Sequence, residues 1–208
     1  MPEKDASWVY ADTFAIESEA MLAARESALQ FGLPTVSPAT GAQLALAAAG
    51  RPAATMIEFG TGTGVSGLWL LRGAPGAHLT TIDVDLDHHQ VARTHFSAAG
   101  HPAKQVRLIT GRAADVLPRM NEASYDVVHV DVDADGVSAT VEGALRLARP
   151  GGTVLVAHVL SGGRVPNPTK RDRATVAYRE LLKGLRERDD LLLGISPVGD
   201  GLLQIVPR

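Results

Sequence analysis

Two acidic residues lie on either side of a glycine-rich segment, and their charges bear on what it binds. The segment EFGTGTGVSG, residues 58–67, begins with Glu58 and carries four glycines. Glycine lets a backbone turn tightly and approach a ligand, and the N–H groups that open a following helix face that ligand. Asp83 follows about twenty residues later, where a carboxylate accepts hydrogen bonds from ribose hydroxyls.

The same glycines match the pattern G-x-G-x-x-G, which is typical of NAD sites. Glu58 would repel a pyrophosphate, whereas it suits a ligand with an ammonium and a sulfonium group. S-adenosylmethionine therefore fits these charges better than NAD does. Two other interpretations stay open: a tight turn that binds nothing, and a Glu58 whose hydrogen bonds are satisfied inside the core.

A second acidic segment raises the question of a metal site. VHVDVDADG, residues 128–136, places Asp131, Asp133 and Asp135 at alternate positions. Three carboxylates this close repel one another unless a cation or solvent offsets their charges. We expect Asp133 and Asp135 to face solvent in a loop, and Asp131 to form a polar wall of a pocket.

The histidines receive different expectations. His158 follows an apolar segment, at the end of a strand where open α/β sheets place their sites. An imidazole can accept a hydroxyl proton near neutral pH, so His158 is a candidate base. We expect His129 to lie in the core or behind the site, and His88 and His89 to be solvated.

The remaining pattern predicts the scaffold that positions these residues. Short apolar segments at residues 55–59, 78–83, 105–109, 125–131 and 153–157 alternate with stretches that can form helices. This alternation is typical of a doubly wound α/β fold, a parallel sheet covered on both faces. Further helices are expected at residues 17–31, 38–50 and 169–188. The segments LLLGIS and LLQIV, joined by PVGDG, predict an antiparallel hairpin at the end.

The composition is ordinary for a globular chain of 208 residues, with 45 % hydrophobic and 21 % charged residues. We expect a single domain over residues 1–208, with N-terminal helices in 1–50 and a cofactor-binding α/β core in 51–208. The net charge of −3 argues against a surface built for nucleic acid. The absence of cysteine excludes thiolate metal sites and fits a cytoplasmic protein. We expect neither a signal peptide nor a membrane span.

A series of motifs resembles the S-adenosylmethionine-dependent O-methyltransferases of the catechol and caffeoyl-CoA type. In order they are LPTVSPATGAQL, EFGTGTGVSGLWL, TTIDVD, GRAADVLP, YDVVHVDVDADG, LARPGG, HVLSGGRV and PVGDGL. The resemblance implies the Rossmann-like class I methyltransferase fold, with a seven-stranded, mostly parallel sheet and an antiparallel C-terminal hairpin. It also implies S-adenosyl-L-methionine as cofactor, a hydroxylated small-molecule acceptor, and a homodimer, to which the aromatic residues Trp8 and Tyr10 could contribute.

The resemblance further implies a set of cofactor contacts. Val36 and Ser66 would lie at the methionine end, Asp83 would reach the ribose, and Arg112 and Ala113 would border the adenine. Simple core packing is as good an interpretation for Val36 and Val84. The matching positions are Val36, Glu58, Gly60, Thr61, Gly62, Ser66, Asp83, Val84, Arg112, Ala113, Asp131 and Asp133. At Arg112 the family more often has an acid.

In the resembled enzymes a magnesium ion holds the acceptor oxygens. It is bound by an acid after strand four and an Asp-Asn pair after strand five, and a lysine assists deprotonation. Here Asp131 is the only ligand retained, Ala134 stands for the lysine, and Ala157 and His158 stand for the pair. We therefore predict no family magnesium site, and expect Asp131 and His158 to be catalytic. A softer ion such as zinc stays open if another aspartate completes the shell.

One basic segment, GGRVPNPTKRDR, carries Arg164, Lys170, Arg171 and Arg173. We expect a solvated loop; the alternative is a docking patch for an anionic acceptor such as a CoA ester, a phosphate or RNA. The expected function is that of an S-adenosylmethionine-dependent O-methyltransferase with a degenerate metal site. A protein that binds S-adenosylmethionine without catalysis and an NAD-dependent oxidoreductase are the alternatives.

Overall fold

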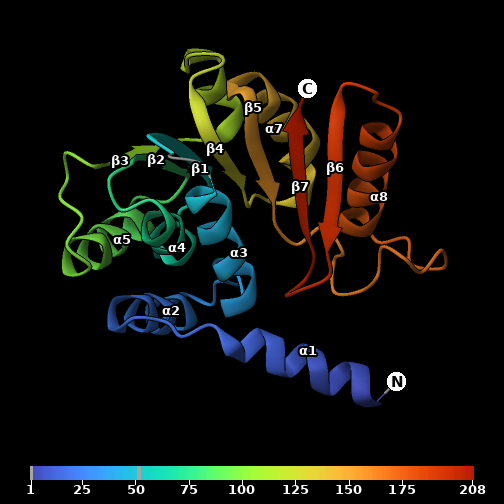
Figure 1. The fold of residues 1–208 in the computed structure, drawn as a ribbon, viewed down its shortest axis with the longest axis horizontal. Coiled ribbons are helices and arrows are strands. Elements are labelled where there is room, and N and C mark those ends of the chain that lie inside the picture. The colour runs from blue at the N-terminus through green and yellow to red at the C-terminus, as the bar shows by residue number, and fades with distance from the viewer. Residues whose placement is uncertain (1, 51–52) are drawn as a thin grey trace.

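The structure, a computed structural model, describes residues 2–50 and 53–208, with the side chains of residues 2–5 left out. A seven-stranded sheet forms its centre, in the order β3-β2-β1-β4-β5-β7-β6 (Figure 1). The first five strands are parallel, and β7 runs antiparallel to both of its neighbours. The strands are β1 (Thr55–Phe59), β2 (His78–Asp83), β3 (Val106–Thr110), β4 (Tyr125–Val130), β5 (Ala148–Val156), β6 (Leu191–Ser196) and β7 (Leu202–Pro207).

Nine helical segments surround this sheet in the described residues. They are α1 (Pro2–Phe14), α2 (Glu19–Phe31), α3 (Pro38–Ala49), α4 (Val65–Gly73), α5 (Leu86–Ala98), α6 (Ala113–Val116), the 3₁₀ turn η1 (Leu117–Arg119), α7 (Ala134–Leu147) and α8 (Arg173–Arg186). Two separate apolar cores cover the two faces of the sheet. Helices α2 to α5 contribute to one core, and α7 and α8 to the other, so the predicted doubly wound fold is confirmed.

Helix capping explains where two helices begin. Helix α2 starts at residue 19 and not at 17, because the Ser18 hydroxyl accepts a hydrogen bond from the Met21 N–H. Helix α8 starts at residue 173 and not at 169, because the Asp172 carboxylate caps it through the Thr175 N–H. Proline at the first position and the Ser37 cap start α3 as expected.

Two further features of the fold differ from the expectation. Helix α1 was not predicted, and it carries exposed Trp8 and Tyr10. Strand β5 begins at Ala148 and not at residue 153, because Ala148 pairs with Tyr125 before the register of the two strands shifts. Both differences lie away from the carboxyl ends of the central strands.

The N-terminal helices pack into the same core as the sheet, since Met21 and Leu44 are buried against β1 and α4. The expected boundary between residues 50 and 51 meets residues 51–52, which lie outside the described residues. Among the described helices, none has the length and apolar character that a membrane crossing requires.

Candidate active site

A cavity of about 650 Å³ opens at the carboxyl ends of β1, β2, β4 and β5. This is where open α/β sheets place their ligands. The structure brings most of the predicted site residues together in its wall. Those that line it are Val36, Gly60, Thr61, Gly62, Ser66, Asp83, Val84, Ala113, Asp131, Asp133 and His158. Their contact with a cofactor stays a prediction.

The glycine loop forms the floor of this cavity between β1 and α4. Gly60 and Gly62 have φ angles of 100° and 49°, which disfavour other residues. A Cβ atom on Gly60 would overlap the carbonyl oxygen of Asp131, so the loop lies directly against the end of β4. The N–H of Asp131 donates to the carbonyl of Phe59 at 2.8 Å, which fixes this contact. Glycine at position 60 is therefore required by the crossing of two chain segments.

Asp83 is held rigidly at the end of β2. Its Oδ2 accepts from the N–H of Gly62 at 2.8 Å, and its Oδ1 accepts from the N–H of Asp85 at 3.0 Å. His88 Nδ1 lies 3.3 Å from the same Oδ1. A carboxylate oxygen has two lone pairs, so Oδ2, whose partner is the N–H of Gly62, can still accept a hydrogen bond from a ribose hydroxyl.

The expectation that His88 and His89 are solvated was wrong. His88 lines the cavity, and its ring packs edge-on against Phe31 with centroids 5.4 Å apart. His89 is buried between the hydroxyls of Thr61 and Thr110, and this burial lowers its pKa. Both side chains point inward because they lie on the side of α5 that packs against β2 and β3.

Glu58 lies in the core and not in the cavity wall. It is fully buried, and the strand register places Thr81 on β2 and His129 on β4 beside it. Thr81 Oγ1 donates to Glu58 Oε2 at 2.8 Å, and His129 Nδ1 lies 3.2 Å from Oε1. Glu58 is therefore a core acid whose carboxylate is hydrogen-bonded inside the protein, which is one of the two interpretations left open by the sequence. His129 lies in the core, as expected. Thr81 also contacts Thr61 at 2.6 Å, so the hydrogen-bonded chain ends at the cavity wall.

Arg112 also lies apart from the cavity. Its guanidinium is exposed and pairs with Asp115 one turn along α6 at 3.0 Å, which directs it to solvent. Its neighbour Ala113 does line the cavity, so only the second of the two predicted adenine contacts is in place.

The inner end of the cavity combines an imidazole with carboxylates. His158 Nε2 lies 3.6 Å from Asp131 Oδ1, and His158 Nδ1 lies 3.7 Å from Asp200 Oδ2. Tyr178 of α8 completes this wall, and its side chain is only 6 % exposed. Burial, with the nearby charges of Asp131, Asp200 and Asp133, raises the pKa of Tyr178 to about 12. The phenol therefore keeps its proton and can act as a hydrogen-bond donor near neutral pH.

Sequence reasoning did not assign Tyr178 or Asp200 to the site. Tyr178 shares the buried face of α8 with Leu181 and Leu185, so its spacing indicates only core packing. Asp200 belongs to PVGDGL, which predicted the turn of the C-terminal hairpin and is one of the motifs that resemble the family. The one available signal was the charge of Asp200 between two glycines of a turn.

The residues at the inner end do not match an oxygen-donor magnesium site. Ala157 is buried and offers no donor atom, and the next position supplies an imidazole nitrogen. Asp135 is exposed, as expected, and engages Arg173 at 2.7 Å. Within residues 2–50 and 53–208, no group of three or more His, Cys, Asp or Glu side chains could hold a metal ion.

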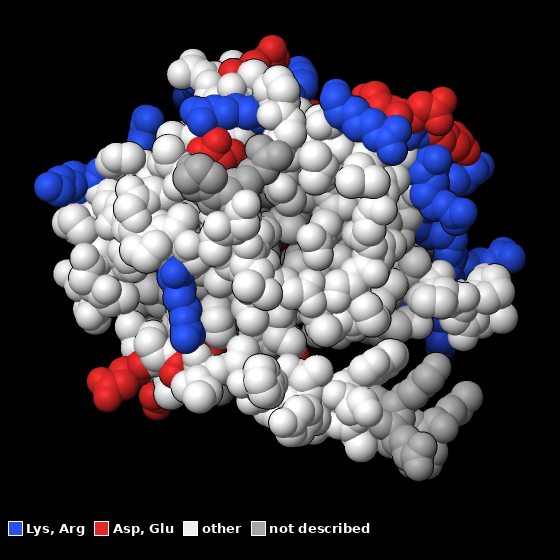
Figure 2. All heavy atoms as spheres, viewed as in Figure 1, with Lys and Arg blue, Asp and Glu red and all other residues white. Residues whose placement is uncertain are grey.

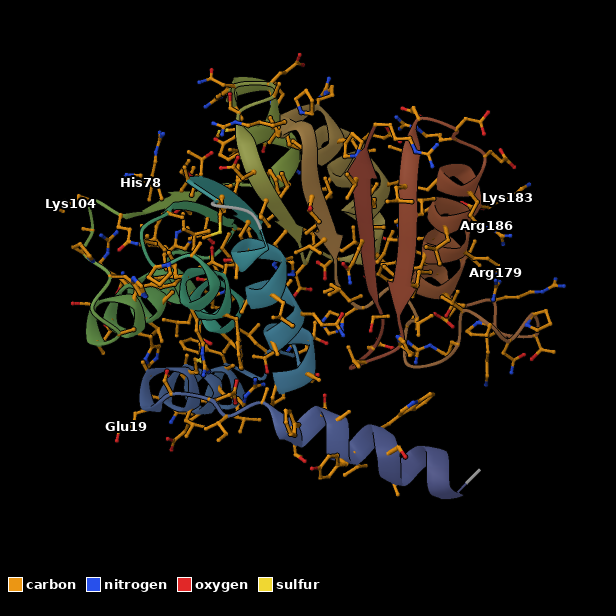
Figure 3. The ribbon with its side chains drawn as sticks, viewed as in Figure 1. Glu19, His78, Lys104, Arg179, Lys183 and Arg186 are labelled. Atoms are coloured by element: carbon orange, nitrogen blue, oxygen red, sulfur yellow. The ribbon has the colours of Figure 1, made fainter. Side chains whose placement is uncertain are left out.

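The basic segment lies between β5 and α8. Arg164 lines the cavity, donates to Ser161 Oγ at 3.1 Å and lies 3.6 Å from Asp172. Lysine and arginine side chains gather along the edge of the molecule over α8 (Figure 2). Arg179, Lys183 and Arg186 point outward there, away from the sheet (Figure 3).

The comparisons with known proteins assign this fold and cavity to one class. A family model described as "O-methyltransferase" matches residues 12–206. A Mycobacterium tuberculosis protein (strain H37Rv) whose name describes it as an O-methyltransferase is 40 % identical over 200 residues. The match covers 96 % of this chain and 89 % of that protein. A solved structure from Corynebacterium glutamicum has a TM-score of 0.90 at 30 % identity, covering 99 % of this chain and 97 % of its own. The O-methyltransferase TomG of Streptomyces achromogenes, solved with S-adenosylmethionine, has a TM-score of 0.83 at 30 % identity, covering 96 % and 94 %.

The chain therefore belongs to the O-methyltransferase family. Family membership confirms the resemblance to the caffeoyl-CoA type of enzyme, and with it an S-adenosylmethionine-dependent methyltransferase. Nothing in the comparisons supports an NAD-dependent oxidoreductase or a protein without catalysis.

Proposed function

We propose that this enzyme methylates a hydroxyl group of a small acceptor, and that His158 takes the hydroxyl proton without help from a magnesium ion. The observation that carries the proposal is the pair of His158 Nε2 and Asp131 Oδ1, 3.6 Å apart at the inner end of the cavity. Position 157, where the family has a carboxylate ligand, is an alanine. The chain thus keeps the acid beside the methyl position and replaces the metal-binding pair with a residue that can accept a proton.

The residues around the glycine loop fit the cofactor. S-adenosylmethionine supplies a methyl group on a positively charged sulfur. Asp83 is placed to accept hydrogen bonds from the ribose, and Ser66, at the start of α4, is placed to meet the carboxylate end. The negative charge of Asp131 at the end of β4 favours a positive sulfur nearby. Glu58 acts on this end only through Thr81 and Thr61.

The residues around His158 would hold the acceptor. Tyr178, Ser161 and Val132 give this end of the cavity both polar and apolar walls. His158 Nε2 receives the proton that the acceptor oxygen loses as that oxygen bonds to the methyl carbon, while the bond from sulfur to that carbon breaks. Tyr178, which keeps its proton, can donate a hydrogen bond to the acceptor. Alignment of the two reactants in the cavity supplies most of what this substitution needs.

An anionic acceptor finds less support than a neutral one. Arg164 is engaged by Asp172 and Ser161, and Arg173 is engaged by Asp135. Asp131, Asp133 and Asp200 also line the cavity and would repel a second negative charge. A nucleic-acid acceptor meets the same repulsion at the inner end, and its attraction would come from the basic segment and the basic edge over α8.

The proposal includes a homodimer in the cytoplasm. Helix α1 leaves Trp8, Tyr10 and Phe14 exposed, and large exposed aromatic side chains are typical of surfaces that meet a partner. Leu46 of α3 and Leu192 of β6 are exposed as well. Figure 2 shows the face of the molecule that carries α3 and β6. Few charged side chains lie on the middle of this face. The cysteine-free composition supports the cytoplasmic location.

Calorimetric titration tests the cofactor site. Asp83→Ala removes the acceptor of ribose hydrogen bonds, and charge-assisted hydrogen bonds are worth roughly 1.5–3 kcal/mol. We expect the affinity for S-adenosylmethionine to fall by about tenfold to a hundredfold, and NAD to give no heat. Asp115→Ala, which removes an exposed aspartate paired with Arg112, is the control and should bind normally. Unchanged binding by Asp83→Ala would show that the cofactor lies elsewhere.

A screen of hydroxylated compounds tests the reaction. Each compound is incubated with S-adenosylmethionine carrying a deuterated methyl group, and mass spectrometry detects transfer to oxygen. We expect at least one neutral phenolic acceptor to be methylated by the wild type and only slowly by His158→Gln. Transfer to nitrogen or carbon, or equal rates in both proteins, would contradict the proposed chemistry.

A further inference from the structure

We infer that Asp200 is a positioning residue for His158: its carboxylate holds the imidazole proton on Nδ1 and so leaves Nε2 free to accept a proton from the acceptor. The inference rests on the proposed function of His158 and assigns a role to the turn between β6 and β7. It makes a three-membered array, Asp131, His158 and Asp200, out of residues that lie in three different loops.

The two nitrogens of His158 face different surroundings. Nδ1 lies 3.7 Å from Asp200 Oδ2, whereas Nε2 lies 3.6 Å from Asp131 Oδ1, which borders the glycine loop. Nε2 is buried and has no hydrogen-bond partner among the described residues. A neutral imidazole has one N–H donor and one acceptor nitrogen, and a carboxylate can only accept from it. At 3.7 Å the contact with Asp200 is longer than a hydrogen bond, so Asp200 acts on the ring through its charge. A proton drawn to Nδ1 by that charge makes Nε2 the acceptor.

Two carboxylates compete for the imidazole proton, and their anchoring differs. Asp200 Oδ1 accepts from the N–H of Gly162 at 2.5 Å, which fixes the carboxylate from the side of the loop after β5. Within the described part of the chain, the side chain of Asp131 accepts no such backbone hydrogen bond, and it lines the cavity beside the glycine loop. The fixed carboxylate is the better orienting group, because it keeps its place when the cavity fills.

Backbone hydrogen bonds fasten the two loops together. The N–H of Leu160 donates to the carbonyl of Asp200 at 3.0 Å, and the N–H of Val159 donates to that of Gly201 at 3.2 Å. Gly199, with φ of 58°, lies so close to Thr40 that a Cβ atom would overlap its hydroxyl. The turn that carries Asp200 is thus held between α3 and the loop that carries His158.

The backbone of His158 adds an independent sign of constraint. Its φ angle is 59°, in the left-handed region that non-glycine residues rarely adopt. Such a conformation costs roughly 1–3 kcal/mol and persists only where surrounding contacts impose it. The hydrogen bonds between the two loops are those contacts, and they set the direction in which the imidazole points.

Nuclear magnetic resonance of the full chain, labelled with ¹⁵N-histidine, tests the inference without an acceptor. Long-range ¹H–¹⁵N correlations at about pH 8.5, where an ordinary imidazole is neutral, report which nitrogen carries the proton. His158→Gln identifies the signal. We expect the wild type to carry the proton on Nδ1, and Asp200→Asn to shift most of the population to Nε2–H. Asn keeps an oxygen for Gly162, so the loop contact survives the change. Asp115→Asn, on an exposed helix, is the matched control.

The wild-type spectrum alone is decisive if Asp200→Asn fails to fold. A proton on Nε2, or on both nitrogens, would overturn the inference, as would a tautomer that Asp200→Asn leaves unchanged. Failure of the proposed function looks different: no oxygen methylation appears in the screen, while the tautomer stays as expected. Calorimetry with S-adenosylmethionine accompanies each variant, and equal affinities show that the cofactor site is intact.

Discussion

Glu58 and His129 lie 3.2 Å apart in the middle of the sheet, where neither side chain reaches solvent. Thr81 donates a second hydrogen bond to the Glu58 carboxylate, and Thr61 links Thr81 to the cavity wall. A buried charge is tolerated only when it is paired and hydrogen-bonded, so the strands must keep this register. The pair therefore stabilises the glycine loop through the hydrogen bonds that join Glu58, Thr81 and Thr61.

Removing one partner of this pair should be costly. We expect Glu58→Ala to lower the free energy of unfolding by about 2 kcal/mol or more, because His129 Nδ1 would be left buried without its hydrogen-bond partner. Denaturant unfolding followed by circular dichroism measures the change. Glu142→Ala, which removes a surface partner of Arg188, is the control and should cost less than about 1 kcal/mol. A similar loss in both variants would show that the buried pair carries no special weight.

For single residues, the sequence identified site candidates by their type and their position after a strand. It missed the site residues that only tertiary contacts bring to the cavity. Asp131 and His158 were found because they follow strands, and the structure places them in one cavity wall. Tyr178 and Asp200 join them from α8 and the last turn, which no local pattern relates to β4 and β5. Glu58 was singled out by its charge, but only the pairing of β1 with β2 and β4 shows that it points into the core.

Among the elements, the loop from β1 to α4 has the least freedom to change. Gly60 has φ of 100° and lies against the carbonyl of Asp131, so two chain segments meet there without room for a side chain. The loop's position therefore couples the start of the cofactor site to the end of β4, where Asp131 lies.

We expect Gly60→Ala to lower the free energy of unfolding by more than about 2 kcal/mol. Left-handed backbone alone costs roughly 1–2 kcal/mol for a non-glycine residue, and the overlap with Asp131 adds to it. Thermal unfolding with and without S-adenosylmethionine measures both stability and binding, and we expect binding to be lost. Gly76→Ala, at a glycine with open space around its Cβ position and no positive φ, should change stability by less than about 1 kcal/mol. Equal effects would contradict the close crossing.

The elements themselves were largely predictable, apart from their ends. The strands at residues 55–59 and 78–83 match β1 and β2, because short apolar runs bounded by glycine and aspartate leave little choice. Helix α1 was missed because its apolar residues stay exposed and give no buried face to detect. The early start of β5 depends on its pairing with Tyr125, which is a long-range contact.

For the whole molecule, a doubly wound sheet with an antiparallel end was predictable because strand–helix alternation and a final hairpin allow few arrangements. The association of two chains is not specified by that pattern. It stays a prediction that rests on the family resemblance and on the exposed aromatic residues of α1.

Light scattering at micromolar concentration should give twice the chain mass of 21.8 kDa. Replacing Trp8 and Phe14 together by aspartate should shift the mass toward that of one chain, because charge disfavours an apolar contact. Asp12→Ala, on the same helix, is the control and should leave the mass unchanged. A wild type that is monomeric at every concentration tested would remove the homodimer from the account.

Methyl transfer in the presence of a chelator distinguishes a histidine base from a bound magnesium ion. The rate with an acceptor from the screen is measured after EDTA treatment, then with magnesium added back, for the wild type and His158→Gln. The account predicts full activity of the wild type in EDTA. It also predicts that His158→Gln loses about a hundredfold to ten-thousandfold in turnover, at unchanged affinity for S-adenosylmethionine. Activity that disappears in EDTA and returns with magnesium would contradict it, and would show that Asp131 shares a metal ion with a neighbouring aspartate.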